Sequence, residues 1–313
     1  MAIYAIKHIT RYIYEKPVTE SMNEIRVYPY LCAEQEVLNH ELHISFNPLL
    51  HTYIDYWKNK VGTFSILHPH KELIIENNLL IRTTSPNLLL VNFHSTFLQL
   101  QQEMNGNLSL IELAKAEKIK KQTAIQTIID QIYTDGQSVA EVIEKCSNFI
   151  FKHFKYVKGI TDIETTVDEI LNHKSGVCQD FAHVMLQILR SLNIPSRYVS
   201  GYICPNKVGM RGEGATHAWV EAYIPDFGWA GIDPTNNVWV TNYHVKLAIG
   251  RNFNDCSPVK GTFRGDSRQE LFVQVSIQYE DGKSIAHTNT VKRKEYFPVD
   301  IDLHQSQLGN QQQ

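Results

Sequence analysis

The sequence contains no long hydrophobic run. No stretch of about 20 apolar residues, the length that spans a bilayer, occurs anywhere in its 313 residues. The opening segment MAIYAIKHITRYIYEKP alternates like a strand and lacks the unbroken apolar run and small-residue cleavage site of a secretory signal. We therefore expect a cytoplasmic protein that neither spans a membrane nor is secreted.

The sequence also lacks paired cysteines. Its five cysteines are odd in number and widely spaced, with no Cys-x-x-Cys pair, which excludes a disulfide framework and a zinc knuckle. His183 follows Cys178 by five residues, whereas three or four would place two ligands on one helical face. We expect reduced thiols, no metal and no cofactor. The cysteines are Cys32, Cys146, Cys178, Cys204 and Cys256.

No block of like charge is present either. The formal net charge is -3, and no basic run suggests nucleic-acid binding or acidic block a solvating tail. Apolar residues make up 43%, enough for a sizeable core in one large domain or two. These features exclude nucleic acid and membrane as expected partners, and they carry no signal of oligomeric state.

The first 107 residues are predicted to form a β domain. Ile3–Tyr14 and Leu38–Phe46 alternate between apolar and polar residues, and Lys71–Thr84 is rich in apolar and β-branched residues. His51–Leu67 is typical of a hairpin, with its turn expected at Asn59–Gly62. Four or more strands with turns between them predict an antiparallel sandwich. The structure of the connector Ser85–Asn107 is left open.

Residues 108–255 are predicted to form a mixed helix-and-strand domain. Leu108–Tyr133 is rich in helix formers, and Ser138–Tyr156 has apolar residues at helical spacing behind a Ser138 cap. Residues 256–295 are expected to pack back on the β domain, and residues 304–313 to form a frayed tail. Further elements are predicted at Thr165–His173 as a helix, and at Ser196–Cys204, Thr216–Ile224, Gly228–Pro234 and Glu270–Glu280 as strands.

Cys178 is the candidate nucleophile. It follows a Ser175-Gly176 turn and begins CQDFAHVMLQILRSL, which has the apolar face of a helix. Unpaired N–H groups and the positive dipole end of a helix N-terminus favour a thiolate, and the same groups can donate to an oxyanion. A lone cysteine is more often a buried thiol, so this position needs partners elsewhere in the sequence.

His217 and Asp233 supply those partners. His217 opens the strand HAWVEAYI and Asp233 ends the strand GWAGIDP, with a turn expected at Pro225–Gly228. Antiparallel pairing of these strands brings the two side chains together, where the carboxylate can orient the imidazole. Strand pairing does not by itself bring Cys178 to this pair.

Three separated blocks, GVCQDFAHVMLQILRSLNIPSRYVSGY, HAWVEAYIPDFGWAGIDPTNN and GRNFNDCSPVKGTFRG, together resemble the bacterial transglutaminase-like family, a branch of the papain-like cysteine enzymes. HITRYIYEKPVTESMNEIRVYP resembles the N-terminal β domain of that family. The resemblance implies an α+β fold in which an antiparallel β-sandwich precedes a papain-like core, with the cysteine-bearing helix packed on an antiparallel sheet. It also implies that Cys178 is the nucleophile, His217 the general base and acid, and Asp233 the orienting residue.

Three further residues are candidates for the surroundings of the site. Gln179 and Tyr156 could donate to the oxyanion, and Trp219 shares a strand face with His217, where it would either wall the cleft or pack in the core. The expected function is acyl transfer on an amide or peptide substrate through a thioester. Hydrolysis by a protease or amidase is favoured, because aminolysis needs a second, water-excluding amine site. Transglutaminase-type aminolysis and a catalytically silent binding module are the alternatives.

Overall fold

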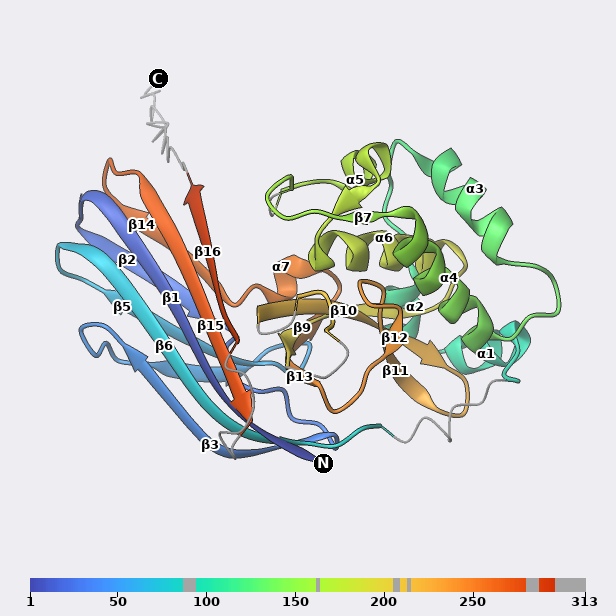
Figure 1. Cartoon of the computed structure of the whole chain (residues 1–313), viewed down its shortest axis with the longest axis horizontal. Helices are drawn as coiled ribbons and strands as arrows, with labels where there is room; N and C mark the ends of the chain where they lie inside the picture. The colour runs from blue at the N-terminus through green and yellow to red at the C-terminus, as the bar shows by residue number, and fades with distance from the viewer. Residues whose placement is uncertain (87–93, 162–163, 205–208, 213–214, 280–286, 296–313) are drawn as a thin grey trace, which may run out of the picture.

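The computed structural model describes residues 1–86, 94–161, 164–204, 209–212, 215–279 and 287–295. Most strands gather at one side of the molecule and the helices at the other, around a further sheet (Figure 1). The fold is α+β with antiparallel main sheets, as the sequence predicts. No helix in the described part of the chain is long and apolar enough to cross a bilayer.

The N-terminal strands form an antiparallel β-sandwich. Tyr14, Ile25 and Phe64 belong to the apolar cluster between its two sheets, because alternate residues of each strand point to one face. The first sheet has the order β16 (His287–Glu295), β15 (Gln269–Tyr279), β1 (Ala2–Val18), β6 (His70–Thr83) and β3 (Gln35–Ile44). The second has the order β14 (Val259–Arg264), β2 (Glu20–Ile25), β5 (Lys60–Ile66) and β4 (His51–Ile54).

Strands that follow the core return to the sandwich. β14 pairs with β2, and β15 pairs with β1 from Tyr4 opposite Tyr279 to Tyr14 opposite Gln269. Both ends of the described chain therefore contribute to the same two sheets. The domain boundaries at 107/108 and 255/256 stay predictions, and the tail at 304–313 lies outside the described residues.

The α+β core, by which we mean residues 97–257, consists of helices around one antiparallel sheet. The sheet has the order β12 (Val238–Trp239), β11 (Gly228–Asp233), β10 (Ala215–Ile224), β9 (Ser196–Ile203) and β13 (His244–Gly250). A short parallel pair joins β7 (Lys155–Tyr156) to β8 (Ser175–Gly176). The helices are α1 (Phe97–Met104), α2 (Leu108–Ala114), α3 (Gln122–Ile132), α4 (Val139–His153), α5 (Val167–His173), α6 (Cys178–Ser191) and α7 (Phe253–Cys256).

Helix α6 packs on the central sheet. Phe181 and Met185 of α6 are fully buried in one apolar cluster with Val220 and Ala222 of β10. Trp219, which directly precedes Val220 on β10, points to the opposite face and belongs to a separate small cluster. The helix that bears Cys178 therefore packs on an antiparallel sheet, as expected.

The segment Leu108–Tyr133, which is rich in helix formers, is not helical throughout. The structure has two helices, α2 and α3, because the backbone between them bonds to distant side chains. The Asp168 carboxylate accepts from the N–H groups of Lys120 (3.1 Å) and Lys121 (2.7 Å), and Gln187 bonds both N–H and C=O of Glu117. Helix propensity therefore yields to tertiary hydrogen bonds.

One further expectation changes, and the structure fills in part of a segment that the sequence left open. The hairpin of β4 and β5 turns before the predicted Asn59–Gly62, because the Asp55 side chain accepts from the N–H of Asn59 (2.9 Å) and closes the turn there. The connector before residue 108 contains α1, whose N-cap Thr96 and Gln99 form a reciprocal capping box. That Thr-x-x-Gln spacing is visible in the sequence.

Candidate active site

Cys178 is the first residue of α6 and is partly exposed. The N-cap residue, Val177, has no side-chain oxygen, so the Asp180 carboxylate three residues later accepts its backbone N–H at 2.7 Å. Thr161 donates to the same carboxylate oxygen at 2.6 Å. Ser175 and Gly176, expected as a turn, form the short strand β8, and a Cβ at Gly176 would collide with Asp180, so a glycine is needed there. Asp180 therefore caps the N-terminus of α6.

The pairing of β7 with β8 holds Tyr156 next to the residues that precede Cys178. It lies opposite Gly176 in this pair, and the next N–H along, that of Val157, donates to the Gly176 carbonyl at 2.9 Å. Its hydroxyl lies near Gly212, where an added Cβ would be 2.9 Å from His217 Nδ1 and 3.8 Å from the hydroxyl. Burial, together with the nearby Cys178, raises the pKa of Tyr156, which keeps its hydroxyl protonated as a hydrogen-bond donor.

His217 and Asp233 meet through the hairpin of β10 and β11. The strands pair from Val220 opposite Ile232 to Ile224 opposite Gly228, close to the turn predicted from the sequence. His217 Nε2 and Asp233 Oδ2 are 2.8 Å apart, and both side chains are fully buried. His217 Nδ1 has no hydrogen-bond partner among the described residues. The nitrogen that Asp233 does not use is thus available for proton transfer.

Asp233 is surrounded by donors. Its Oδ1 accepts the N–H of Thr235 at 2.9 Å, and its Oδ2 accepts the Asn236 amide at 2.7 Å. His244 of β13 approaches Oδ2 to 3.5 Å through Nε2. The Nδ1 of His244 accepts the N–H of Thr241, so its proton lies on Nε2 and faces the carboxylate.

The electrostatics of the pair follow from this arrangement. Burial acts to raise the pKa of Asp233, but His217 and His244 hold it well below its usual range. Burial likewise acts to lower the pKa of His217, but the Asp233 carboxylate and the Cys178 sulfur raise it to about 10. The geometry favours an ionised carboxylate and an imidazolium at neutral pH.

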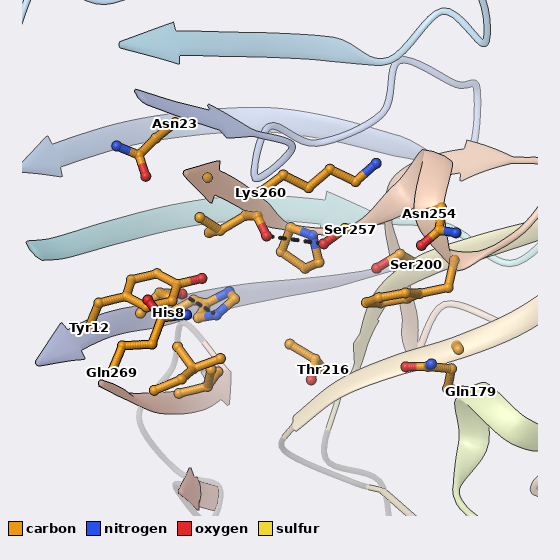
Figure 2. Close-up of a pocket in the computed structure, with 18 of the residues that line it drawn as sticks. His8, Tyr12, Asn23, Gln179, Ser200, Thr216, Asn254, Ser257, Lys260 and Gln269 are labelled. Carbon is orange, nitrogen blue, oxygen red and sulfur yellow. Dashed lines mark hydrogen bonds between the residues drawn. The ribbon is translucent and has the colours of Figure 1, made fainter. Parts of the chain in front are cut away.

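A cavity of about 400 Å³ opens beside these residues. Cys178, Gln179 and His217 line it, so the structure brings the predicted nucleophile to the predicted base. Figure 2 shows Gln179 and Thr216 of the core on one side of the cavity and His8 and Tyr12 of the sandwich on the other.

Trp219 lies beneath this surface. It is fully buried, with its ring 6.4 Å from that of His217 and nearly parallel to it, in the small apolar cluster on that face of the sheet. The structure therefore places Trp219 in the core, which was one of its two expected positions, rather than in the cavity wall.

Sequence reasoning missed His244, Asn236 and Gly212. Thr235 and Asn236 follow Asp233 by two and three residues. An aspartate that accepts the N–H two residues later is a recognised turn pattern, so these could have been found. His244 is 11 residues downstream on another strand, and no local pattern links it to Asp233. His183, the other residue considered near Cys178, instead accepts the N–H of Phe253 at 3.2 Å. Within the described residues, no three metal-ligating side chains gather.

Comparison with known proteins agrees with this architecture. Residues 126–234 match the Transglutaminase-like superfamily, and residues 4–82 match the Bacterial transglutaminase-like N-terminal region. An uncharacterized protein of Mycobacterium leprae is 31% identical over 283 residues, which cover 87% of this chain and 97% of that protein. A Protein-glutamine gamma-glutamyltransferase of Pseudomonas aeruginosa is 37% identical over 76 residues, 23% of this chain and 11% of that one.

A solved structure shares the whole fold. A "Putative Cysteine Protease" from Cytophaga hutchinsonii matches with a TM-score of 0.68 at 17% identity, covering 95% of this chain and 92% of that one. The likeness extends over sandwich and core together. The sequence similarity supports an enzyme that works by cysteine-based acyl transfer. The chain belongs to the transglutaminase-like superfamily, with a bacterial transglutaminase-like N-terminal region preceding its core.

Proposed function

We propose that the chain hydrolyses amide or peptide bonds, with Cys178, His217 and Asp233 as its catalytic triad. One observation carries the proposal: a fully buried His217–Asp233 hydrogen bond of 2.8 Å adjoins the cavity that Cys178 and His217 both line. A nucleophile, a base and an orienting carboxylate are the three parts that cysteine-dependent acyl transfer requires.

The steps of the reaction follow from the positions of these groups. The Cys178 thiolate attacks the carbonyl carbon, and N–H groups at the start of α6 donate to the oxyanion that forms. The imidazolium of His217 gives its Nδ1 proton to the leaving amine, so that a thioester and a free amine result. His217, now neutral, takes a proton from water, which attacks the thioester and releases the acid and the thiolate. Gln179 and Tyr156 are candidates for a second oxyanion donor.

Water is the simpler acceptor for the acyl group that the thioester carries. Aminolysis requires a site that holds an amine and keeps water out, and a protonated amine needs a counter-charge there. No aspartate or glutamate is among the described residues that line the cavity. The 76-residue similarity to a Protein-glutamine gamma-glutamyltransferase keeps aminolysis as the second candidate.

The experiment is an assay of a peptide and amide library with the purified chain, with and without an added primary amine. We expect release of amine or ammonia, little change on addition of the amine, and complete loss in Cys178→Ala. Incorporation of the added amine would favour transglutamination instead. Activity retained in Cys178→Ala would refute the triad, and no activity together with an unreactive Cys178 would favour a silent binding module.

A further inference from the structure

The cavity lies where strand β1 passes between two apolar cores. Tyr4 and Ile6, near its beginning, belong to the cluster that joins the sandwich to the α+β core. Tyr14 and Val18, near its end, belong to the cluster inside the sandwich. The residues between them on the same face, from His8 to Tyr12, line the cavity. The cavity therefore fills the gap between the two cores.

Strand β15 extends this wall. Antiparallel pairing sets Val273 opposite Thr10 and Leu271 opposite Tyr12, and all four residues line the cavity. The neighbouring residue Gln274 is exposed on the other face of the strand. The sandwich thus contributes a continuous strip of side chains to the cavity that Cys178 and His217 also line. Figure 2 shows Tyr12 and Gln269 of this strip across the cavity from Gln179.

The strip is largely apolar and aromatic. The lining includes Tyr12, Tyr14, Phe263, Leu271 and Val273. The cavity volume of about 400 Å³ suits a large side chain. Around them stand neutral hydrogen-bonding groups such as those of Thr10, Asn23 and Gln269.

The charges of the residues that line the cavity also favour an uncharged substrate side chain. Among its described residues there is no carboxylate, and the single lysine or arginine, Lys260, is exposed. Burial lowers the pKa of His8 to about 4, so this buried ring is neutral at physiological pH. The proposed Cys178 thiolate is already paired with the His217 imidazolium. A lysine or arginine side chain in the cavity would therefore lose its hydration without gaining an unpaired counter-charge, which is costly.

We propose that the β-sandwich forms the specificity wall of the proposed active site and selects substrates with an uncharged aromatic or aliphatic side chain on the acyl side of the cleaved bond. This inference rests on the proposed function. It assigns a task to a part of the chain that holds none of the triad residues. Shape and apolar burial would supply the selectivity, and Val273 and Leu271 are its principal contacts.

The test measures alkylation of Cys178 by acetylated dipeptide chloromethyl ketones in which both residues are Phe, Lys or Glu. Each rate constant is divided by that for iodoacetamide, which is too small to need the wall. We expect the Phe reagent to exceed the Lys and Glu reagents by about tenfold or more, the effect of burying one large apolar side chain. In Val273→Trp the Phe ratio should fall about tenfold, since the added indole fills the cavity. In Gln274→Trp, one residue away on the other face, the ratio should stay at the wild-type value.

Each outcome is decisive. Leu271→Trp serves as a second filling variant, and either variant suffices if its circular dichroism matches that of the wild type. Fast alkylation with no preference for Phe, or with no effect of the filling variants, would overturn this inference and leave the proposed function intact. A preference for Glu that Lys260→Ala removes would also overturn it, in favour of an anionic substrate. Slow alkylation of Cys178 by iodoacetamide would overturn the proposed function, and this inference with it.

Discussion

At Asp233 a single buried carboxylate accepts hydrogen bonds from Thr235, Asn236 and His217, and a second histidine, His244, faces it at 3.5 Å. These donors fix the orientation of the carboxylate and keep it ionised in a site where burial would otherwise favour its neutral form. The carboxylate in turn accounts for much of the raised pKa of His217. The protonation state of His217 therefore depends largely on the charge of the Asp233 carboxylate.

The substitution Asp233→Asn removes the carboxylate charge with little change in shape, and so tests how far the pKa of His217 depends on that charge. In Asp233→Asn, only the Cys178 sulfur still opposes the burial that lowers the pKa of His217. The alkaline limb of kcat/KM, where His217 loses its proton, should then move down from about 10 in the wild type. The rate should fall about 100-fold or more, the usual contribution of a positioned acid–base group.

Stability gives a second readout of the same change. The folded pKa of His217 lies above its ordinary 6.5, so the stabilisation from this pair is complete below pH 6.5 and is lost as the pH rises to about 10. Asp233→Asn should remove this alkaline loss in denaturant unfolding. The matched control is Glu221→Gln, which changes another buried carboxylate of the sheet, paired with Arg197 and Lys246. If the alkaline limb of kcat/KM lies at the same pH in the wild type and in Asp233→Asn, the role assigned to Asp233 is refuted.

The start of helix α6 shows how local sequence positions the nucleophile. Gly176 leaves room for the Asp180 carboxylate, and Asp180 bonds the N–H of Val177 directly before Cys178. The sequence pattern was sufficient to predict this helix and its N-terminus. The break between α2 and α3 could not be predicted, because its backbone bonds to Asp168, nearly 50 residues away.

Two substitutions at Asp180 separate capping from bulk. Asp180→Ala removes the acceptor for both Val177 and Thr161, and we expect a loss of about 1–2 kcal/mol in the free energy of unfolding together with slower alkylation of Cys178. Asp180→Asn keeps an acceptor oxygen of the same size and should lose less of both. Denaturant titration and thiol labelling measure the two effects, and equal losses in the two variants would contradict the capping account.

At the scale of the whole molecule, β1 joins the sandwich to the α+β core. His8 Nδ1 and the Tyr202 hydroxyl of β9 lie 2.8 Å apart, and both residues are buried. The alternation in the sequence predicts β1 and its two faces. It does not predict which neighbour covers each part of a face, because the sandwich core, the α+β core and the cavity all require alternating residues. The specificity wall was therefore invisible in the sequence, whereas the triad residues were predicted from motif and strand order.

The buried His8 makes this contact sensitive to acid. Burial lowers the pKa of His8 from 6.5 to about 4, so its contribution to stability is present above pH 6.5 and is lost as the pH falls towards 4. The full shift corresponds to a loss of about 3 kcal/mol. His8→Gln keeps a hydrogen-bonding group but does not titrate, and should flatten the pH dependence of unfolding over this range.

Some acid sensitivity should remain in that variant, because burial also lowers the pKa of His183 to about 4. The exposed His51 offers a control, since His51→Gln should keep the wild-type pH dependence. Circular dichroism in denaturant at several pH values measures all three proteins. An unchanged slope in His8→Gln would show that this contact does not couple to protonation.

The most direct test of the central claim is the rate at which iodoacetamide modifies each cysteine at neutral pH, followed by peptide mass spectrometry. Cys32 is a matched control, because it is partly exposed like Cys178, while burial raises its pKa to about 11. We predict that Cys178 reacts about 100-fold faster than Cys32, and that His217→Ala removes most of this difference. Equal, slow modification of the two thiols, or fast modification of Cys178 that persists in His217→Ala, would contradict the account.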